Sequence, residues 1–212
     1  YAAIRIPNYD ADKNDYVRST VFVAPSSALI PPNNLYNVAN INVPVDDYTT
    51  AFYFIAWGHP EKTPNTESWR TFLKQTVGED LDEKYRPLRT RENNFWQDRE
   101  LMKSGNFTGI TGFPNQDLAM WVSMGRIADR SADKLGTSDM AVAEFRKRML
   151  KAVQDFMAGD TPIGTGSKAI SPEVCSFQAM IPKTQNWKEF KAVPVWEDNE
   201  LPELEPSYSI PK

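Results

Sequence analysis

Apolar and polar residues alternate along roughly the first sixty positions, and helical spacing begins only after them, so strands precede helices in this chain. Between Tyr16 and Ala24 the alternation puts Val17 on one strand face and Arg18 on the other. A shorter strand over residues 41–45 follows. The run from Thr50 to Trp57 is apolar on both faces, which predicts a central strand covered on both sides. The short connections favour antiparallel pairing.

The helical part begins after Pro60. Apolar residues from Trp69 onward have helical spacing, with Thr66 as the expected cap. Beyond the polar, irregular stretch 78–115, a helix is expected from about Gln116 to Met124, with Asn115 as N-cap and Gly125 just past its end. A longer helix is expected from about Ser138 to Met157, with an inner stripe formed by Val142, Phe145, Met149, Val153 and Phe156.

Strands followed by long helices are typical of an α+β fold in which the helices lie across an antiparallel sheet. We assign residues 1–192 to this domain. The final segment, 193–212, holds four prolines among acidic residues, which predicts an extended C-terminal arm.

Composition excludes several classes of function. Of 212 residues, 41% are hydrophobic and 25% charged, as in folded globular chains. A net charge of −4 lacks the basic footprint of a nucleic-acid binder, and no apolar run reaches the ~20 residues that span a bilayer. Because His59 and Cys175 are the single histidine and single cysteine, an intrachain disulfide and a structural zinc site are excluded. A metal site with two histidines cannot be completed from these residues alone.

The first residue also bears on domain organisation. The chain begins with Tyr1 rather than methionine, and the next residues already alternate as in a strand. We interpret the sequence as the later part of a longer polypeptide. The alternative is simple removal of methionine or of a short leader.

Asp117 is the first candidate functional residue. It lies in helical register with the large apolar residues Met120, Trp121 and Met124, so this face is expected to point inward. A carboxylate on a buried stripe is costly unless it is hydrogen-bonded, paired or bound to a metal. The alternative is that Asp117 only favours the positive end of the helix dipole.

Arg18 is the second candidate. Its strand face also carries Tyr16, Thr20 and Phe22, a mixture suited to lining a cavity. A guanidinium can bind a carboxylate through two parallel hydrogen bonds. A surface arginine or a structural ion pair is the alternative, and Arg5 on the preceding strand is a weaker candidate of the same kind.

Residues 116–139 carry a specific resemblance. Their pattern, Q-D-x-A-M-x-x-S-M-G-x-I-x-D-R-S-x-x-x-L-G-T-S-D, resembles the signature of the phthalate 4,5-dioxygenase group of Rieske non-haem iron oxygenases. Supporting similarity lies at residues 43–47 and 106–110. One departure is Arg126, where that group usually has proline; it lies at the helix exit, away from Asp117.

The resemblance implies a fold and a metal site. The fold would be a helix-grip catalytic domain, START-like, with an antiparallel sheet and long C-terminal helices. Asp117 would be the carboxylate of a 2-His-1-carboxylate triad that holds mononuclear Fe(II). The two histidine ligands, and the Rieske domain with its 2Fe–2S cluster, would lie upstream. His59 matches neither ligand position and is interpreted as a loop histidine, and Cys175 as an inert buried thiol.

The same resemblance implies a cytoplasmic oxygenase that hydroxylates a phthalate-like aromatic carboxylic acid with O2. Electrons would come from a reductase component through the Rieske cluster, and Arg18 would bind the substrate carboxylate. Family members form homotrimers or stacked trimers. The competing hypothesis is a metal-free helix-grip module that binds a hydrophobic or aromatic ligand.

Overall fold

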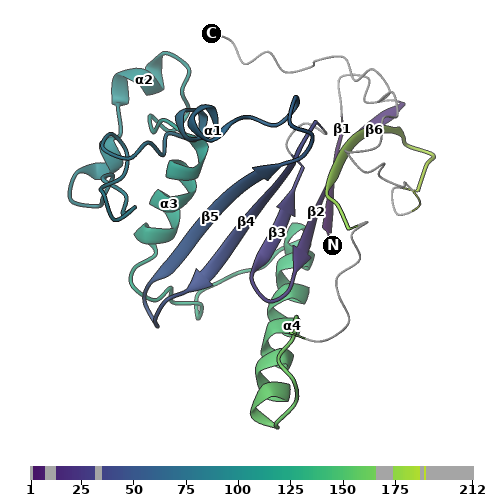
Figure 1. The fold of residues 1–212 in the computed structure, drawn as a ribbon. Coiled ribbons are helices and arrows are strands. Elements are labelled where there is room, and N and C mark those ends of the chain that lie inside the picture. Colours follow the sequence, from purple (N-terminus) through teal and green to yellow (C-terminus); the bar gives the residue numbers. More distant parts are fainter. Residues whose placement is uncertain (1, 8–12, 32–34, 166–173, 187–188, 190–212) are drawn as a thin grey trace. The chain divides into compact units, whose positions relative to one another are not determined.

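The computed structural model describes residues 2–7, 13–31, 35–165, 174–186 and 189, so the predicted arm at 193–212 lies outside the described residues. Strands precede helices, as predicted, and one further strand follows them (Figure 1). The strands are β1 (Ala2–Pro7), β2 (Asn14–Val23), β3 (Ser27–Ile30), β4 (Asn37–Pro44), β5 (Thr50–Trp57) and β6 (Phe177–Pro182). The α-helices are α1 (Thr66–Leu73), α2 (Arg99–Lys103), α3 (Phe113–Ser123) and α4 (Met140–Met157), with short 3-10 helices at Asn94–Trp96 and Thr137–Asp139.

The strands form one six-stranded sheet in the order β1-β2-β3-β4-β5, and β6 pairs with β2. The β1–β2, β2–β6, β2–β3 and β3–β4 pairs are all antiparallel. The first part of β2 is held on both edges, since Arg18 is opposite Ile4 of β1 and Gln178 of β6. The α+β class and the antiparallel sheet are therefore confirmed.

The alternation in β2 produces two different faces, as predicted. Val17 is fully buried and packs with Ala179 and Ile181 of β6 to form the core. On the opposite face, Phe22 meets Phe145 of α4 edge-to-face, with ring centroids 4.8 Å apart. The face that carries Arg18 is therefore the face on which α4 packs.

The prediction that Thr50–Trp57 is a central strand covered on both sides is wrong. β5 is the last strand of the main path, and Tyr53 is 54% exposed and Trp57 39%. The run is apolar on both faces, but in the part of the chain that the structure describes only one face is covered. The end of β4 is also left uncovered among the described residues: Val43 is exposed, whereas Val38 near the start of the strand is buried.

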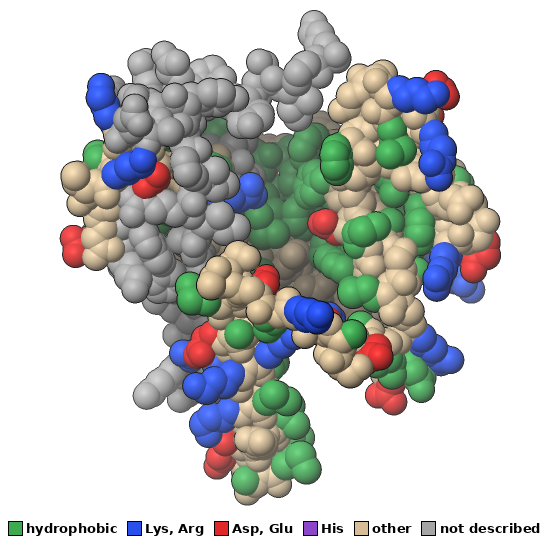
Figure 2. All heavy atoms as spheres, turned by 180° about the vertical axis from the view of Figure 1, so that it is seen from behind, with side chains coloured by type: hydrophobic (Ala, Val, Ile, Leu, Met, Phe, Trp, Pro, Cys, Tyr) green, Lys and Arg blue, Asp and Glu red, His purple; other side chains and the backbone are tan. Residues whose placement is uncertain are grey.

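Two helix predictions are also corrected. Asn65, not Thr66, caps α1, because its side chain accepts a hydrogen bond from the Ser68 amide (2.9 Å). No residue of α4 is buried, so the expected inner stripe is only partly covered among the described residues: Phe145 meets Phe22, while Phe156 is 60% exposed. In Figure 2 hydrophobic side chains gather along one side of α4 at the bottom of the view, with charged ones on the other.

The chain divides into two compact units. The sheet unit contains Tyr1–Val43, Phe52–Thr63 and Phe145–Lys212, and the helical unit contains Pro44–Ala51 and Pro64–Glu144. Among the described residues, no helix is both long enough and apolar enough to cross a membrane.

Candidate functional site

Helix α3 carries Asp117 and begins earlier than predicted. It starts at Phe113, with Pro114 in its first turn and Gly112 at the N-cap position, so Asn115 is a helical residue and not the cap. Proline favours the first helical turn, where its missing N–H costs no hydrogen bond. The other end agrees with prediction, since Gly125 follows the helix with a φ of +93°.

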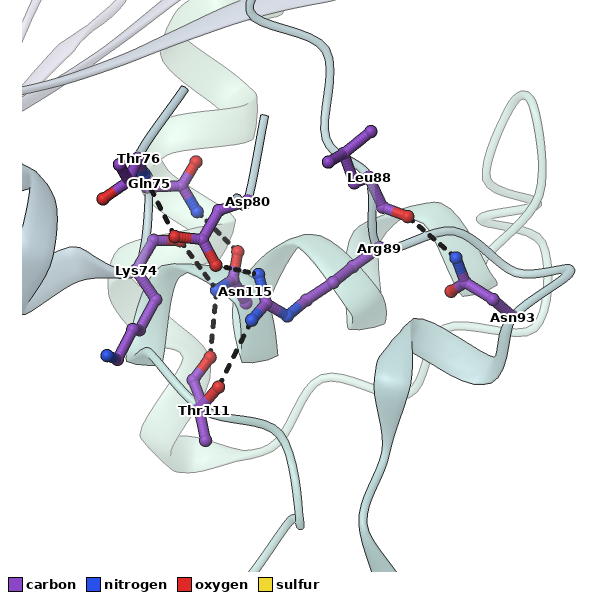
Figure 3. A network of polar contacts seen from close by, with 9 residues as sticks. All are labelled: Lys74, Gln75, Thr76, Asp80, Leu88, Arg89, Asn93, Thr111 and Asn115. Atoms are coloured by element: carbon purple, nitrogen blue, oxygen red, sulfur yellow. Dashed lines mark hydrogen bonds and ion pairs between the residues drawn. The ribbon is translucent and has the colours of Figure 1, made fainter. Parts of the chain in front are cut away.

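Asn115 fixes the first turn of α3 from its buried side. Its side chain accepts a hydrogen bond from Gln75 Nε2 (2.5 Å) and donates to the carbonyl oxygens of Lys74 (3.1 Å) and Thr111 (2.9 Å). Figure 3 shows these bonds converging on Asn115. The helix start is therefore tied to the segment that ends α1.

A buried ion pair organises the stretch that we expected to be irregular. Arg89 Nη1 lies 2.6 Å from Asp80 Oδ1, and the side chains of Arg89 and Asp80 are only 10% and 7% exposed. Asp80 also accepts a hydrogen bond from the Thr76 amide (3.0 Å), and Arg89 donates to Thr111 Oγ1 (3.3 Å) (Figure 3). The guanidinium lies over the Trp96 ring, 4.8 Å from its centroid. This network anchors the residues just before α3.

Gly112 permits the close approach between α1 and α3. Its φ is +78°, and a Cβ there would lie 2.6 Å from the Leu73 carbonyl oxygen. We expect Gly112→Ala to destabilise the helical unit by about 2–5 kcal/mol, since left-handed strain costs about 1–2 kcal/mol and overpacking about 1–3 kcal/mol. Chemical unfolding would measure this loss.

The control is Gly125→Ala, because Gly125 also has a positive φ (+93°) but an added Cβ would meet nothing within 4 Å. It should lose only the conformational part, about 1–2 kcal/mol. Equal losses in the two variants would contradict a steric role for Gly112.

Asp117 lies on the open side of α3. Residues two positions apart in an α-helix are separated by about 200° around its axis, so Asp117 is nearly opposite Asn115. Its neighbours in register are exposed: Met120 by 62%, Trp121 by 41% and Met124 by 46%. The prediction that this face points inward is therefore wrong for the described residues. The helix buries Pro114, Asn115 and Ala119 instead.

The environment of Asp117 fits a metal ligand. Asp117 is exposed among the described residues, although nearby atoms desolvate its carboxyl group and raise its pKa, and no described residue hydrogen-bonds or ion-pairs with it. A carboxylate with both oxygens available, on an apolar surface, suits coordination of a cation. Within the described ranges, no group of three or more His, Cys, Asp and Glu side chains could hold a metal ion. Asp117 is thus a single candidate ligand.

The one departure from the signature, Arg126, lies just beyond the C-terminal end of α3. The Arg126 guanidinium lies over the Tyr48 ring, 3.5 Å from its centroid. Tyr48 belongs to a turn in which Asp46 accepts hydrogen bonds from the amides of Tyr48 (2.8 Å) and Thr49 (2.7 Å), which lower the pKa of Asp46. Arg126 therefore makes a contact within the helical unit that does not involve Asp117.

Arg18 belongs to the sheet unit. It is half-buried on the β2 face that carries Phe22. Among the residues that the structure describes, Arg18 has no hydrogen-bond or ion-pair partner, so the alternative of a structural ion pair has no support there. Arg5 lies in β1, where the side chains are not described.

His59 agrees with its interpretation as a loop histidine, whereas Cys175 is less buried than expected. His59 is exposed in a loop, where Nδ1 accepts a hydrogen bond from the Glu61 amide (3.3 Å). Cys175 is a half-buried thiol, and desolvation raises its pKa. A raised thiol pKa lowers the thiolate fraction, which fits the inert role.

Comparison with known proteins identifies the family of the chain. The family described as "LigXa C-terminal domain like" matches residues 1–211. The chain is 62% identical over 211 residues to the phthalate 4,5-dioxygenase oxygenase subunit of Pseudomonas putida, covering 99% of this chain and 48% of that protein. It is 30% identical over 194 residues to the 3-chlorobenzoate-3,4-dioxygenase oxygenase subunit of Comamonas testosteroni, covering 84% of this chain and 44% of that protein.

The chain thus spans about half the length of the curated relatives it matches. The resemblance to the C-terminal catalytic part of Rieske oxygenases, suggested by residues 116–139, is confirmed. The chain belongs to the LigXa C-terminal domain like family.

Proposed function

We propose that this chain is the C-terminal part of the catalytic domain of an aromatic-ring oxygenase, over residues 1–192, and that Asp117 is its iron ligand. The observation that carries the proposal is the carboxylate of Asp117, which has no hydrogen-bond or ion-pair partner among the described residues, in a chain 62% identical to a dioxygenase oxygenase subunit. Both relatives are named as oxygenase subunits of aromatic-acid dioxygenases. The proposed substrate is therefore a phthalate-like aromatic carboxylate, hydroxylated with O2.

Asp117 supplies one of the three protein ligands of a facial triad, and two histidines from outside these residues supply the others. Mononuclear Fe(II) bound there supplies the activation of O2. The part of this chain is to present the carboxylate from the open side of α3, while Met120 and Trp121 provide apolar surface beside it. Such surface limits water around a bound aromatic ring.

Arg18 orients the substrate in this proposal. Its half-buried guanidinium has its donors available among the described residues and lies on the face where Phe22 meets α4. A planar guanidinium matches a carboxylate through two parallel hydrogen bonds. The pairing would fix which ring edge is presented for hydroxylation.

We expect Arg18→Gln in the intact native protein to raise KM for phthalate about 10–100-fold, because a hydrogen bond to a charged group contributes about 1.5–3 kcal/mol. KM for a neutral aromatic substrate should change little. The assay is incorporation of isotopically labelled O2 into the ring, with a chemical reductant or the reductase.

The matched control is Arg70→Ala, since Arg70 forms a surface ion pair with Glu67 of the same helix, α1 (3.6 Å). Equal effects of Arg18→Gln on the charged and neutral substrates would contradict the role of Arg18. Absence of ring hydroxylation in the loaded wild-type protein would contradict the proposed function itself and favour a metal-free binding module.

The proposal extends to partners. The relatives are named as oxygenase subunits, which supports a separate reductase that delivers electrons through a Rieske 2Fe–2S cluster held outside this chain. A cytoplasmic homotrimer or stack of trimers is the assembly implied by the resemblance.

A further inference from the structure

We propose that Asn115 is a positioning residue for Asp117: its side chain holds the first turn of α3, so that the carboxylate is presented at one fixed place. The inference rests on the proposed function of Asp117 as iron ligand. It assigns a role to a residue that touches neither metal nor substrate.

Both N–H donors and the oxygen of the buried Asn115 amide are engaged in hydrogen bonds. Asn115 is 4% exposed; its oxygen accepts from Gln75, and its two N–H groups donate to the Lys74 and Thr111 carbonyls. A buried amide with every donor partnered is held in one orientation, because any rotation leaves a polar group unsatisfied. The first turn of α3 is therefore fixed in rotation as well as in position.

The partners of Asn115 are themselves anchored. Lys74 is the C-cap of α1, in the left-handed conformation (φ +55°). Thr111 accepts a hydrogen bond from Arg89, which forms the buried ion pair with Asp80. Gln116, beside Asn115, donates to the Ile110 carbonyl (3.0 Å). Three separate segments therefore meet at the helix start.

Asn115 and Asp117 lie in the same helical turn: Asn115 anchors it and Asp117 presents the carboxylate. They are about 3 Å apart along the axis and nearly opposite each other around it. Because the hydrogen bonds of Asn115 hold the buried side of this turn, they also fix the direction of Asp117 on its open side. Supporting residues set the geometry of metal ligands in this way. Small rotations of this turn would displace the carboxylate directly.

The test is Asn115→Asp in the intact native protein. The variant keeps the size and the acceptor facing Gln75, but it replaces the N–H donors with an oxygen facing two carbonyls. We expect the affinity for Fe(II) at the mononuclear site to fall about 10–100-fold, as for other supporting partners of metal ligands. The Rieske cluster absorbance should be retained.

The matched control is Asn93→Asp. Asn93 also accepts from a backbone amide (Thr90, 2.9 Å) and donates to a carbonyl (Leu88, 2.8 Å; Figure 3), and both of these partners lie outside α3. Its Fe(II) affinity should be unchanged. A lower unfolding temperature of Asn115→Asp with wild-type Fe(II) affinity would show a purely structural role and overturn the inference.

Gln75→Met keeps the test decisive if Asn115→Asp does not fold. It removes one donor to Asn115 and leaves the two carbonyl bonds, so Fe(II) affinity should fall about 3–10-fold. Unchanged affinity in this variant would also overturn the inference. If Asp117→Ala itself retained the iron, the proposed function would fail first, so the two failures are distinguishable.

Discussion

Asp117→Ala is expected to abolish ring hydroxylation and to lower Fe(II) affinity of the intact protein by more than about 100-fold. Loss of a supporting partner already costs about 10–100-fold, and loss of a ligand should cost more. Because no described residue hydrogen-bonds or ion-pairs with Asp117, the substitution removes no such bond among the described residues. The unfolding temperature and the cluster absorbance should therefore stay near wild type, while mononuclear iron, measured by metal analysis, disappears.

Asp129→Ala is the matched control for this variant. Asp129 lies in the same signature, but it is exposed and its side chain accepts a hydrogen bond from the Ser131 amide (2.9 Å). Mononuclear iron should be retained in this variant. If Asp117→Ala bound iron as tightly as Asp129→Ala, the assignment of Asp117 would be wrong.

Asp80→Ala should cause the largest loss of stability, about 3–5 kcal/mol, because it leaves the buried Arg89 guanidinium without its carboxylate. The Thr76 amide loses its acceptor as well. Hydrogen exchange of peptides covering residues 76–115 would measure the local free energy of opening.

Two comparisons give the Asp80 prediction its specificity. Lys103→Ala removes an exposed pair, in which Lys103 and Glu100 are 72% and 79% exposed, and should cost less than about 1 kcal/mol. The double variant Asp80→Leu/Arg89→Met should recover part of the loss, since two apolar side chains can replace a buried ion pair. If Asp80→Ala cost no more than Lys103→Ala, the network would not anchor α3 as we describe.

Much of the sheet could be predicted because alternation in a strand is local. The buried Val17 and the helix-facing Phe22 follow directly from the period of two in β2. The position of β5 could not be predicted in this way. An apolar run such as Phe52–Trp57 shows that its surface avoids water, but not which part of a protein covers it.

The start of α3 was mispredicted for a related reason. Asparagine is a good N-cap, but the Asn115 side chain hydrogen-bonds to Gln75, 40 residues away in sequence, and the helix already begins at Phe113, with Pro114 in its first turn. The Asp80–Arg89 pair also joins residues in a stretch without periodicity, so no local signal indicated it.

The helical register made Asp117 a candidate, and the signature supplied its proposed role as iron ligand. Register with Met120 and Trp121 predicted an inward face, yet the structure leaves that face open among the described residues. Periodicity indicates that side chains share a face, while the identity of what lies opposite depends on the rest of the protein.

The central claim, that Asp117 binds the mononuclear iron, is tested most directly by locating the iron in crystals of the intact protein. Anomalous difference maps collected on either side of the iron absorption edge should show a mononuclear iron in direct contact with an Asp117 carboxylate oxygen. A mononuclear iron bound by other side chains, with the Asp117 carboxylate outside coordinating distance, would contradict the account.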